Sequence, residues 1–328
     1  TEHFMKTNGA PMQIAVDNLT YTWIADWAKV SSGAGFAHHG ITVLKSGNIL
    51  TGHATDAKVQ ELDPQGVVKR EFKVPVCGTH CLHVAEENGQ EVLWIADVTG
   101  KGGANEGPQV VKVDMTGKLL ARLTKADTGY GEAENFCPTA LAVDAATGNV
   151  WITDGYGSSR TMCFSPKLKL LRTIDGSDGL GRFSCPHWVH IDTRKGTPEV
   201  YVADRAKDRI QVYSTEGKFL RGITTGLVTP SGFASFGDYL VVAELKARLV
   251  LLDKEDRIVG YIGAGPQNVV KKGWPNRFDA TNVAHPPQPD IRVGEFNSPH
   301  GVCADRQGNI YVSEWLLGDR FTKLQRVA

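Results

Sequence analysis

The sequence lacks the features of membrane, nucleic-acid-binding and disulfide-rich proteins. No apolar run approaches the roughly 18 residues of a membrane-spanning helix, so we expect no membrane insertion. The 36 Lys and Arg residues balance the 36 Asp and Glu residues, which leaves no net field to recruit nucleic acid. The six cysteines of the 328-residue chain have no CxxC spacing, which argues against a thiolate zinc site and leaves one or two disulfides open.

The first residue is Thr1 rather than Met. A cleaved export signal is one explanation, which favours a secreted or periplasmic protein, and a trimmed tag is another. The hydrophobic fraction of 41% is typical of a globular chain, and 36 glycines indicate many tight turns.

A short unit recurs along the chain: an apolar run, a Gly-Asn type turn, and a second apolar run that ends in an acid. The best copies are 138–143 with 149–154, 186–191 with 200–204, and 299–304 with 309–314. Weaker copies start near His39, His80 and Ser231. Each segment alternates with period two, which is typical of strands.

Six such units of four strands each predict an all-β, six-bladed β-propeller that forms a single domain over residues 1–328. We expect the early strand 21–26 to pair with the C-terminal blade and close the ring. A two-sheet sandwich is the alternative, but it does not explain six copies of one unit.

The residue at the start of each innermost strand forms a column around the channel. In blade order this column reads His39, His80, Thr139, His187, Ser231 and His300. Since the chain has ten histidines, six positions chosen at random would contain about 0.2 histidine. The pattern contains four, although the adjacent His38 leaves the register of the first blade open by one residue.

His80, His187 and His300 belong to alternate blades, about 120° apart around a six-fold ring. Three converging imidazoles with an open axial position are typical of a catalytic metal site, so we predict zinc or another divalent transition metal. His39 is a possible fourth group, either on the metal or hydrogen-bonded to its water. The alternative is that the histidines only pack in the channel.

The ends of the second strands share a mouth with this column. These ends carry His53, Asp97, Asp154, Asp204, Glu244 and Glu314, which we expect mostly to fasten turns. Tyr156 and Arg205 are not required by the repeat, so we predict proton transfer for the tyrosine and anion binding for the arginine. Three long insertions reach the same mouth: 124–136, 175–185 and 264–298, the last of which we expect to form a lid over the channel.

The units resemble NHL repeats, and longer stretches resemble peptidyl-α-hydroxyglycine α-amidating lyase, a six-bladed propeller with zinc on three histidines. The resemblance is carried by 136–139, 153–156, 186–187, 202–205, 209–211 and 296–300. It implies that His80, His187 and His300 are zinc ligands and that Tyr156 and Arg205 are catalytic. It also implies a structural calcium ion near the carbonyls of Ile41 and Leu82.

Several positions depart from the pattern of that family. Gly301 replaces an aspartate that binds calcium, which argues against calcium here, and Ser298 replaces a methionine. Ala54 stands in place of an arginine, and Gly157 stands where a disulfide partner of Cys137 would be. The resemblance therefore implies a conserved metal and acid–base machinery with altered specificity.

These observations favour a metal-dependent lyase that acts on a small, polar, hydroxylated substrate at the channel mouth. A metal-dependent hydrolase of lactonase or esterase type is the first alternative, since metal-bound water can attack a carbonyl. A non-enzymatic interaction propeller of NHL type is the second.

Overall fold

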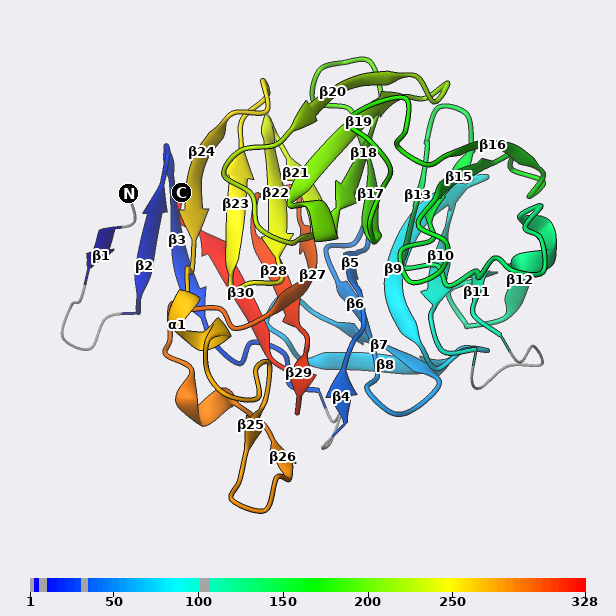
Figure 1. Cartoon of the computed structure of the whole chain (residues 1–328). Helices are drawn as coiled ribbons and strands as arrows, with labels where there is room; N and C mark the ends of the chain where they lie inside the picture. Colours follow the sequence, from blue (N-terminus) through cyan, green and yellow to red (C-terminus); the bar gives the residue numbers. More distant parts are fainter. Residues whose placement is uncertain (1–2, 6–10, 31–34, 101–106) are drawn as a thin grey trace.

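The computed structural model describes residues 3–5, 11–30, 35–100 and 107–328, and nearly all regular structure in them is β (Figure 1). Five four-stranded antiparallel sheets and one six-stranded sheet follow one another in chain order. The innermost strands of neighbouring sheets contact one another in a closed cycle around the central axis. This arrangement confirms the predicted six-bladed β-propeller.

The first three blades follow one another along residues 41–174. Blade one contains β5 (Ile41–Val43), β6 (Ile49–Gly52), β7 (Lys58–Leu62) and β8 (Val68–Lys73). Blade two contains β9 (Thr79–Glu87), β10 (Gln90–Asp97), β11 (Gln109–Val113) and β12 (Leu119–Leu123). Blade three contains β13 (Ala140–Val143), β14 (Val150–Thr153), β15 (Thr161–Phe164) and β16 (Leu170–Ile174).

Blades four and five follow over residues 186–262. Blade four contains β17 (Pro186–Asp192), β18 (Glu199–Asp204), β19 (Arg209–Ser214) and β20 (Phe219–Ile223). Blade five contains β21 (Pro230–Phe236), β22 (Tyr239–Glu244), β23 (Arg248–Leu252) and β24 (Ile258–Ile262). These boundaries agree with the repeats predicted from the sequence.

The sixth blade joins the two ends of the chain. It contains β27 (Pro299–Ala304), β28 (Ile310–Glu314), β30 (Phe321–Arg326), β3 (Leu19–Ile24), β2 (Gln13–Val16) and β1 (His3–Met5). Strand β3 pairs antiparallel with β30, so Trp23 lies opposite Leu324. The expected closure by the early strand is confirmed, and it leaves no gap between the first and last blades of the ring.

Short elements flank or connect the blades. They are β4 (Phe36–Ala37), β29 (Leu316–Leu317), α1 (Pro266–Val269), β25 (Arg277–Phe278), β26 (Ala284–His285), and the 3-10 turns η1 (Lys125–Asp127), η2 (Arg205–Lys207) and η3 (Gln288–Asp290). Most of the 264–298 insertion lies on the lower side of Figure 1 with β4 and β29. In the described ranges no helix is long and apolar enough to cross a membrane.

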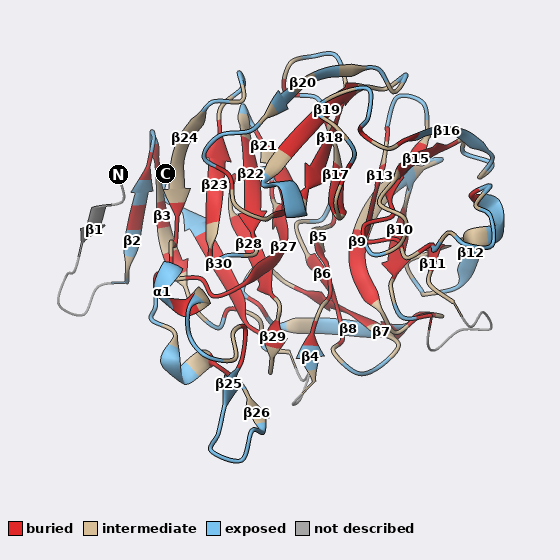
Figure 2. Ribbon diagram, viewed as in Figure 1, coloured by how far each residue is buried: buried red, intermediate tan, exposed pale blue. Residues whose placement is uncertain are grey.

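The core lies between the blades, where the alternating apolar residues of adjacent sheets interdigitate (Figure 2). Trp151 and Tyr201 are among its largest fully buried side chains. Exposed residues collect on the outermost strands, such as β12 and β16, and on the connecting loops. The core therefore provides a rigid scaffold for the residues at the channel mouth.

Candidate metal centre

A β-bulge at the start of three innermost strands aims the column histidines at the channel. In β17, Pro186 pairs with Asp204 and Trp188 pairs with Ala203, which leaves His187 as the extra residue. His300 occupies the same place in β27, and His80 does so in β9. A bulge inserts one residue and redirects its side chain, so the repeat places an imidazole at the same height in blades two, four and six.

The three imidazoles converge. The ring centroids of His187 lie 5.0 Å from those of both His80 and His300, and the latter two lie 4.5 Å apart. Nε2 of His300 is 3.1 Å from Nε2 of His80. All three rings are buried. The structure thus brings together the three histidines predicted from alternate blades.

Backbone carbonyls fix the orientation of two of these rings. Nδ1 of His80 lies 2.6 Å from the carbonyl oxygen of Thr139, and Nδ1 of His187 lies 2.7 Å from that of Ser231. Since a carbonyl only accepts, Nδ1 carries the hydrogen in both rings and the Nε2 lone pair faces the cluster. Metal-binding imidazoles are typically held in this way by a second partner.

The third ring lacks such a partner. In the described part of the chain, Nδ1 of His300 is buried without a hydrogen bond. The bulge of β27 places this ring in the channel, but no backbone partner fixes its orientation.

Burial keeps the rings uncharged. It lowers the pKa of His80, His187 and His300 well below the usual range, and the Arg205 charge acts in the same direction. Neutral imidazole is the form that binds a metal ion. The donor set is therefore one that fits a divalent transition metal.

The tyrosine and the arginine predicted for the mouth lie at this cluster. The Tyr156 hydroxyl oxygen is 3.1 Å from Nε2 of His187 and 3.3 Å from Nε2 of His80. The guanidinium carbon of Arg205 lies 5.4 Å from the centre of the Tyr156 ring. Burial raises the pKa of Tyr156 to about 12, partly offset by the Arg205 charge, so the phenol is protonated at neutral pH.

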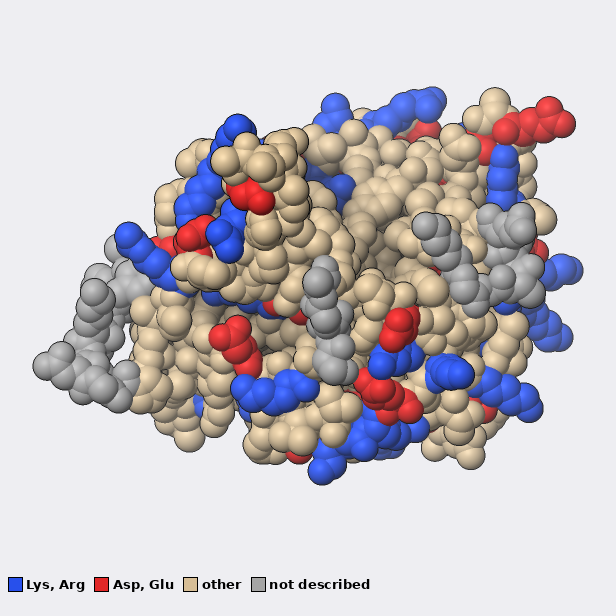
Figure 3. Space-filling model, turned by 90° about the horizontal axis from the view of Figure 1, so that it is seen from below, with Lys and Arg blue, Asp and Glu red and all other residues tan. Residues whose placement is uncertain are grey.

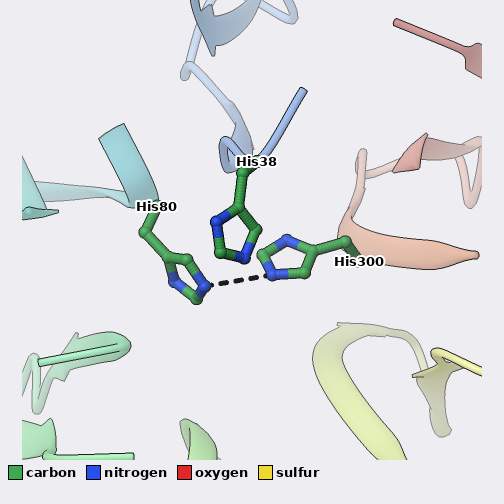
Figure 4. Close-up of side chains that lie close together, drawn as sticks. All are labelled: His38, His80 and His300. Atoms are coloured by element: carbon green, nitrogen blue, oxygen red, sulfur yellow. Dashed lines mark hydrogen bonds between the residues drawn. The ribbon is translucent and has the colours of Figure 1, made fainter. Parts of the chain in front are cut away.

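In the first blade, His38 rather than His39 joins the cluster, which corrects the register of the predicted column by one residue. One ligand nitrogen each from His38, His80 and His300 lie within 4.8 Å of one another, as the converging rings of Figure 4 show. The His39 ring instead lies 5.7 Å from that of Phe321 and is buried. The reason is that β5 begins only at Ile41, so strand alternation does not govern residues 38–40.

The acids at the ends of the second strands fasten turns, as predicted. Each accepts a backbone N–H, and these acids are Asp97, Asp154, Asp204, Glu244 and Glu314. His53 takes the same role in blade one, since its Nδ1 accepts the N–H of Asp56 at 2.9 Å. These residues stabilise the turns at the rim of the channel.

An aromatic wall borders His38. The Trp315 ring lies 6.2 Å from the His38 ring, 5.6 Å from the Phe36 ring and 5.9 Å from the Trp274 ring of the 264–298 insertion.

The lower face of the molecule carries acidic and basic side chains that are interspersed (Figure 3). How far the insertion covers the channel as a lid stays a prediction.

One departure from the amidating-lyase pattern has a steric cause. A Cβ atom on Gly157 would lie 2.1 Å from Oδ1 of Asp154 and 2.3 Å from the carbonyl oxygen of Asn135. No cysteine can stand there without a shift of the turn, and Cys137 is a free thiol.

Comparison with known proteins supports the resemblance. The chain is 28% identical to rat (Rattus norvegicus) peptidylglycine α-amidating monooxygenase over 67% of its length, but spans only 21% of that protein. It is 30% identical to mouse (Mus musculus) NHL repeat-containing protein 3, with 60% of the chain and 58% of the relative covered. It is 26% identical to peptidyl-α-hydroxyglycine α-amidating lyase 2 of Drosophila melanogaster, with 67% and 48% covered. The predicted resemblance to amidating lyases and NHL proteins is confirmed.

The fold also has solved counterparts. A streptogramin B lyase structure matches with a TM-score of 0.57 and 16% identity, covering 94% of this chain and 98% of the other. At this identity the match shows the propeller fold alone. No protein-family model matches the chain.

Proposed function

We propose that this protein is a metal-dependent lyase of the amidating-lyase type, acting on a small, polar, hydroxylated substrate at the channel mouth. The observation that carries the proposal is the contact of the Tyr156 hydroxyl with two Nε2 atoms whose lone pairs face the cluster. A group that can transfer a proton, the Tyr156 hydroxyl, thus lies next to the imidazoles that can bind a metal ion. Three relatives with 67% of the chain aligned bear the word amidating in their names.

The donor set suits an ion of zinc, iron, cobalt, nickel or copper, because imidazole binds all of these. His80, His187 and His300 would hold it. When bound, such an ion polarises a substrate oxygen and stabilises the negative charge that develops on it.

Tyr156 is suited to move the proton in this reaction. In the collapse of an N–CH(OH) group, the carbon–nitrogen bond breaks, a C=O bond forms, the hydroxyl loses a proton and the nitrogen gains one. A neutral phenol can give its proton to the departing nitrogen while it takes the proton of the alcohol, which balances both changes. The pKa of about 12 keeps Tyr156 in the required neutral form.

Arg205 is suited to bind an anionic group of the substrate. It is half-buried beside the neutral imidazoles. Within the described ranges it forms no ion pair with a carboxylate at 4.0 Å or less. Its free charge can therefore pair with a substrate carboxylate, which fits an acid next to the hydroxylated carbon.

The test is a substrate screen on the purified protein, before and after treatment with a chelator. We expect N-acyl-α-hydroxyglycines to be cleaved to an amide and an aldehyde acid, with loss of turnover on chelation and recovery with a divalent metal. Hydrolysis of lactones or esters in place of this cleavage would make the protein a metal-dependent hydrolase. Absence of bound metal and of any turnover would favour the non-enzymatic propeller.

A further inference from the structure

A fourth imidazole, that of His38, faces the three histidines of the alternate blades. Its ring centroid lies 4.5 Å from that of His80 and 4.7 Å from that of His300. Its Nε2 atom lies 3.2 Å from the Tyr156 hydroxyl, the same atom that contacts His80 and His187. His38 therefore shares the point on which the other rings converge.

The backbone on both sides holds this ring in place. Strand β4, which ends one residue before His38, pairs with β29 through Ala37 and Leu316. The Gly40 N–H donates to the carbonyl oxygen of Thr79 at 2.8 Å. The imidazole is thus presented by a fixed segment rather than by a loose loop.

We infer that His38 is a metal ligand in addition to the three histidines of the alternate blades, so that the ion is bound by four imidazoles. The inference rests on the proposed function only for the presence of an ion at this site. It adds to the three histidines of the column a fourth residue, His38, which lies outside the column because it precedes the first strand of its blade.

The distances among His38, His80 and His300 fit such a site, whereas His187 lies outside the set whose ligand nitrogens are all within 4.8 Å of one another. Imidazole nitrogens lie about 2.0–2.1 Å from a transition metal, so two of them are at most about 4.2 Å apart across one ion. The ligand nitrogens of His38, His80 and His300 lie within 4.8 Å of one another. Side-chain rotations that shorten these separations by less than about 1 Å would bring them within the span of about 4.2 Å across one ion. The 3.1 Å between Nε2 of His80 and Nε2 of His300 is close to the ~3.0 Å of ligands at a right angle, and shorter than the ~3.4 Å of tetrahedral ligands.

Four imidazoles also constrain the reactive state of the ion. A tetrahedral ion would be closed by these ligands, like the ion of a structural zinc site. A substrate oxygen can bind only if the ion is five- or six-coordinate. Because an imidazole donates as a neutral ligand, the ion would keep its full charge, which favours an anionic substrate beside Arg205.

X-ray absorption at the cobalt edge tests this arrangement without any activity assay. The chelator-treated full chain is loaded with Co²⁺, and outer-shell scattering counts the imidazoles. We expect four in the wild-type protein and three in His38→Ala, together with a loss of Co²⁺ affinity of at least about tenfold. The neighbouring variant His39→Ala is the matched control and keeps four.

Three imidazoles in the wild-type protein, or an unchanged count and affinity in His38→Ala, would overturn the inference. If His38→Ala does not fold, His38→Gln keeps the side-chain volume and is held to the same outcome. A wild-type protein that binds no Co²⁺ overturns both this inference and the proposed function. Four imidazoles without any lyase turnover support the inference and reject only the proposed function.

Discussion

The hydroxyl oxygen of Tyr156 lies 3.1 Å from Nε2 of His187. Because Nδ1 of His187 gives its hydrogen to Ser231, Nε2 can only accept, and the phenol is the donor of this pair. An ion that takes the Nε2 lone pair would release the phenol hydrogen toward a substrate. The groups proposed to bind the ion and to transfer the proton are neighbours but belong to different residues. Single substitutions can therefore test the two roles separately.

Replacing Tyr156 by Phe removes the hydroxyl and leaves the imidazoles intact. We expect Tyr156→Phe to retain the metal and to lose on the order of 10² or more in turnover, as for a lost acid–base group. Metal content and kcat on the best substrate of the screen measure this. Tyr239→Phe removes a hydroxyl that bonds Asp17 at the start of β22, the end of that strand opposite the channel mouth, and is expected to keep kcat. Full activity in Tyr156→Phe would leave the tyrosine a packing role only.

His187 offers a test of the metal site with a control on the same strand. We expect His187→Ala to lower the metal content to background and abolish turnover, while the circular dichroism of the propeller is retained. The reason is that the blades are held by their apolar cores, and the ion contributes to chemistry more than to folding. His190→Ala removes a histidine whose ring lies 6.3 Å from that of Phe233, and it is expected to keep the metal. Stoichiometric metal in His187→Ala would exclude this residue as a ligand.

The charge of Arg205 is expected to act on substrate binding. We expect Arg205→Ala to raise KM for a carboxylate-bearing substrate at least about tenfold, because a charge-assisted hydrogen bond is lost. The esterified or amidated form of the same substrate should show little change. Lys207→Ala removes an exposed charge from the same 3-10 turn and serves as the control. Equal effects on charged and neutral substrates would argue against anion binding.

The blades could be predicted because the sequence of each repeat contains period-two alternation and glycine turns. The same repeat placed His80, His187 and His300, since equivalent positions of equivalent blades face one axis. The bulge that aims these rings depends on which residues pair across the sheet, so the sequence alone did not reveal it.

His38 could not be chosen over His39 from the sequence for a related reason. It precedes the first strand of its blade, where no alternation fixes the direction of a side chain. Its position depends on the pairing of β4 with β29, two segments about 280 residues apart in the chain, for which no local pattern exists. The contact of Trp274 with Trp315 likewise joins an insertion to the last blade and could only come from the structure.

Asp319, beside His39, is expected to make the stability of the fold depend on pH. Its carboxylate is buried, and in the described residues neither oxygen has a hydrogen bond. Nε2 of His39 is 3.7 Å away, which is too far for a hydrogen bond. Burial lowers the pKa of His39 to about 3, so this ring is neutral and gives no counter-charge. Burial raises the pKa of Asp319 to about 7, above its ordinary value.

The folded state therefore binds a proton at Asp319 that the unfolded state has already released between about pH 4 and pH 7. Its stability should fall as pH rises through this window and level off above it. We expect Asp319→Asn to abolish this slope and to raise the free energy of unfolding at pH 8 by on the order of 2 kcal/mol relative to wild type. Urea unfolding at pH 5 and pH 8 measures the difference. Asp305→Asn is the matched control, because this buried aspartate accepts the N–H groups of Gln307 and Asn309 and its loss should destabilise at both pH values. An equal pH slope in Asp319→Asn and wild type would show that Asp319 titrates normally in the fold.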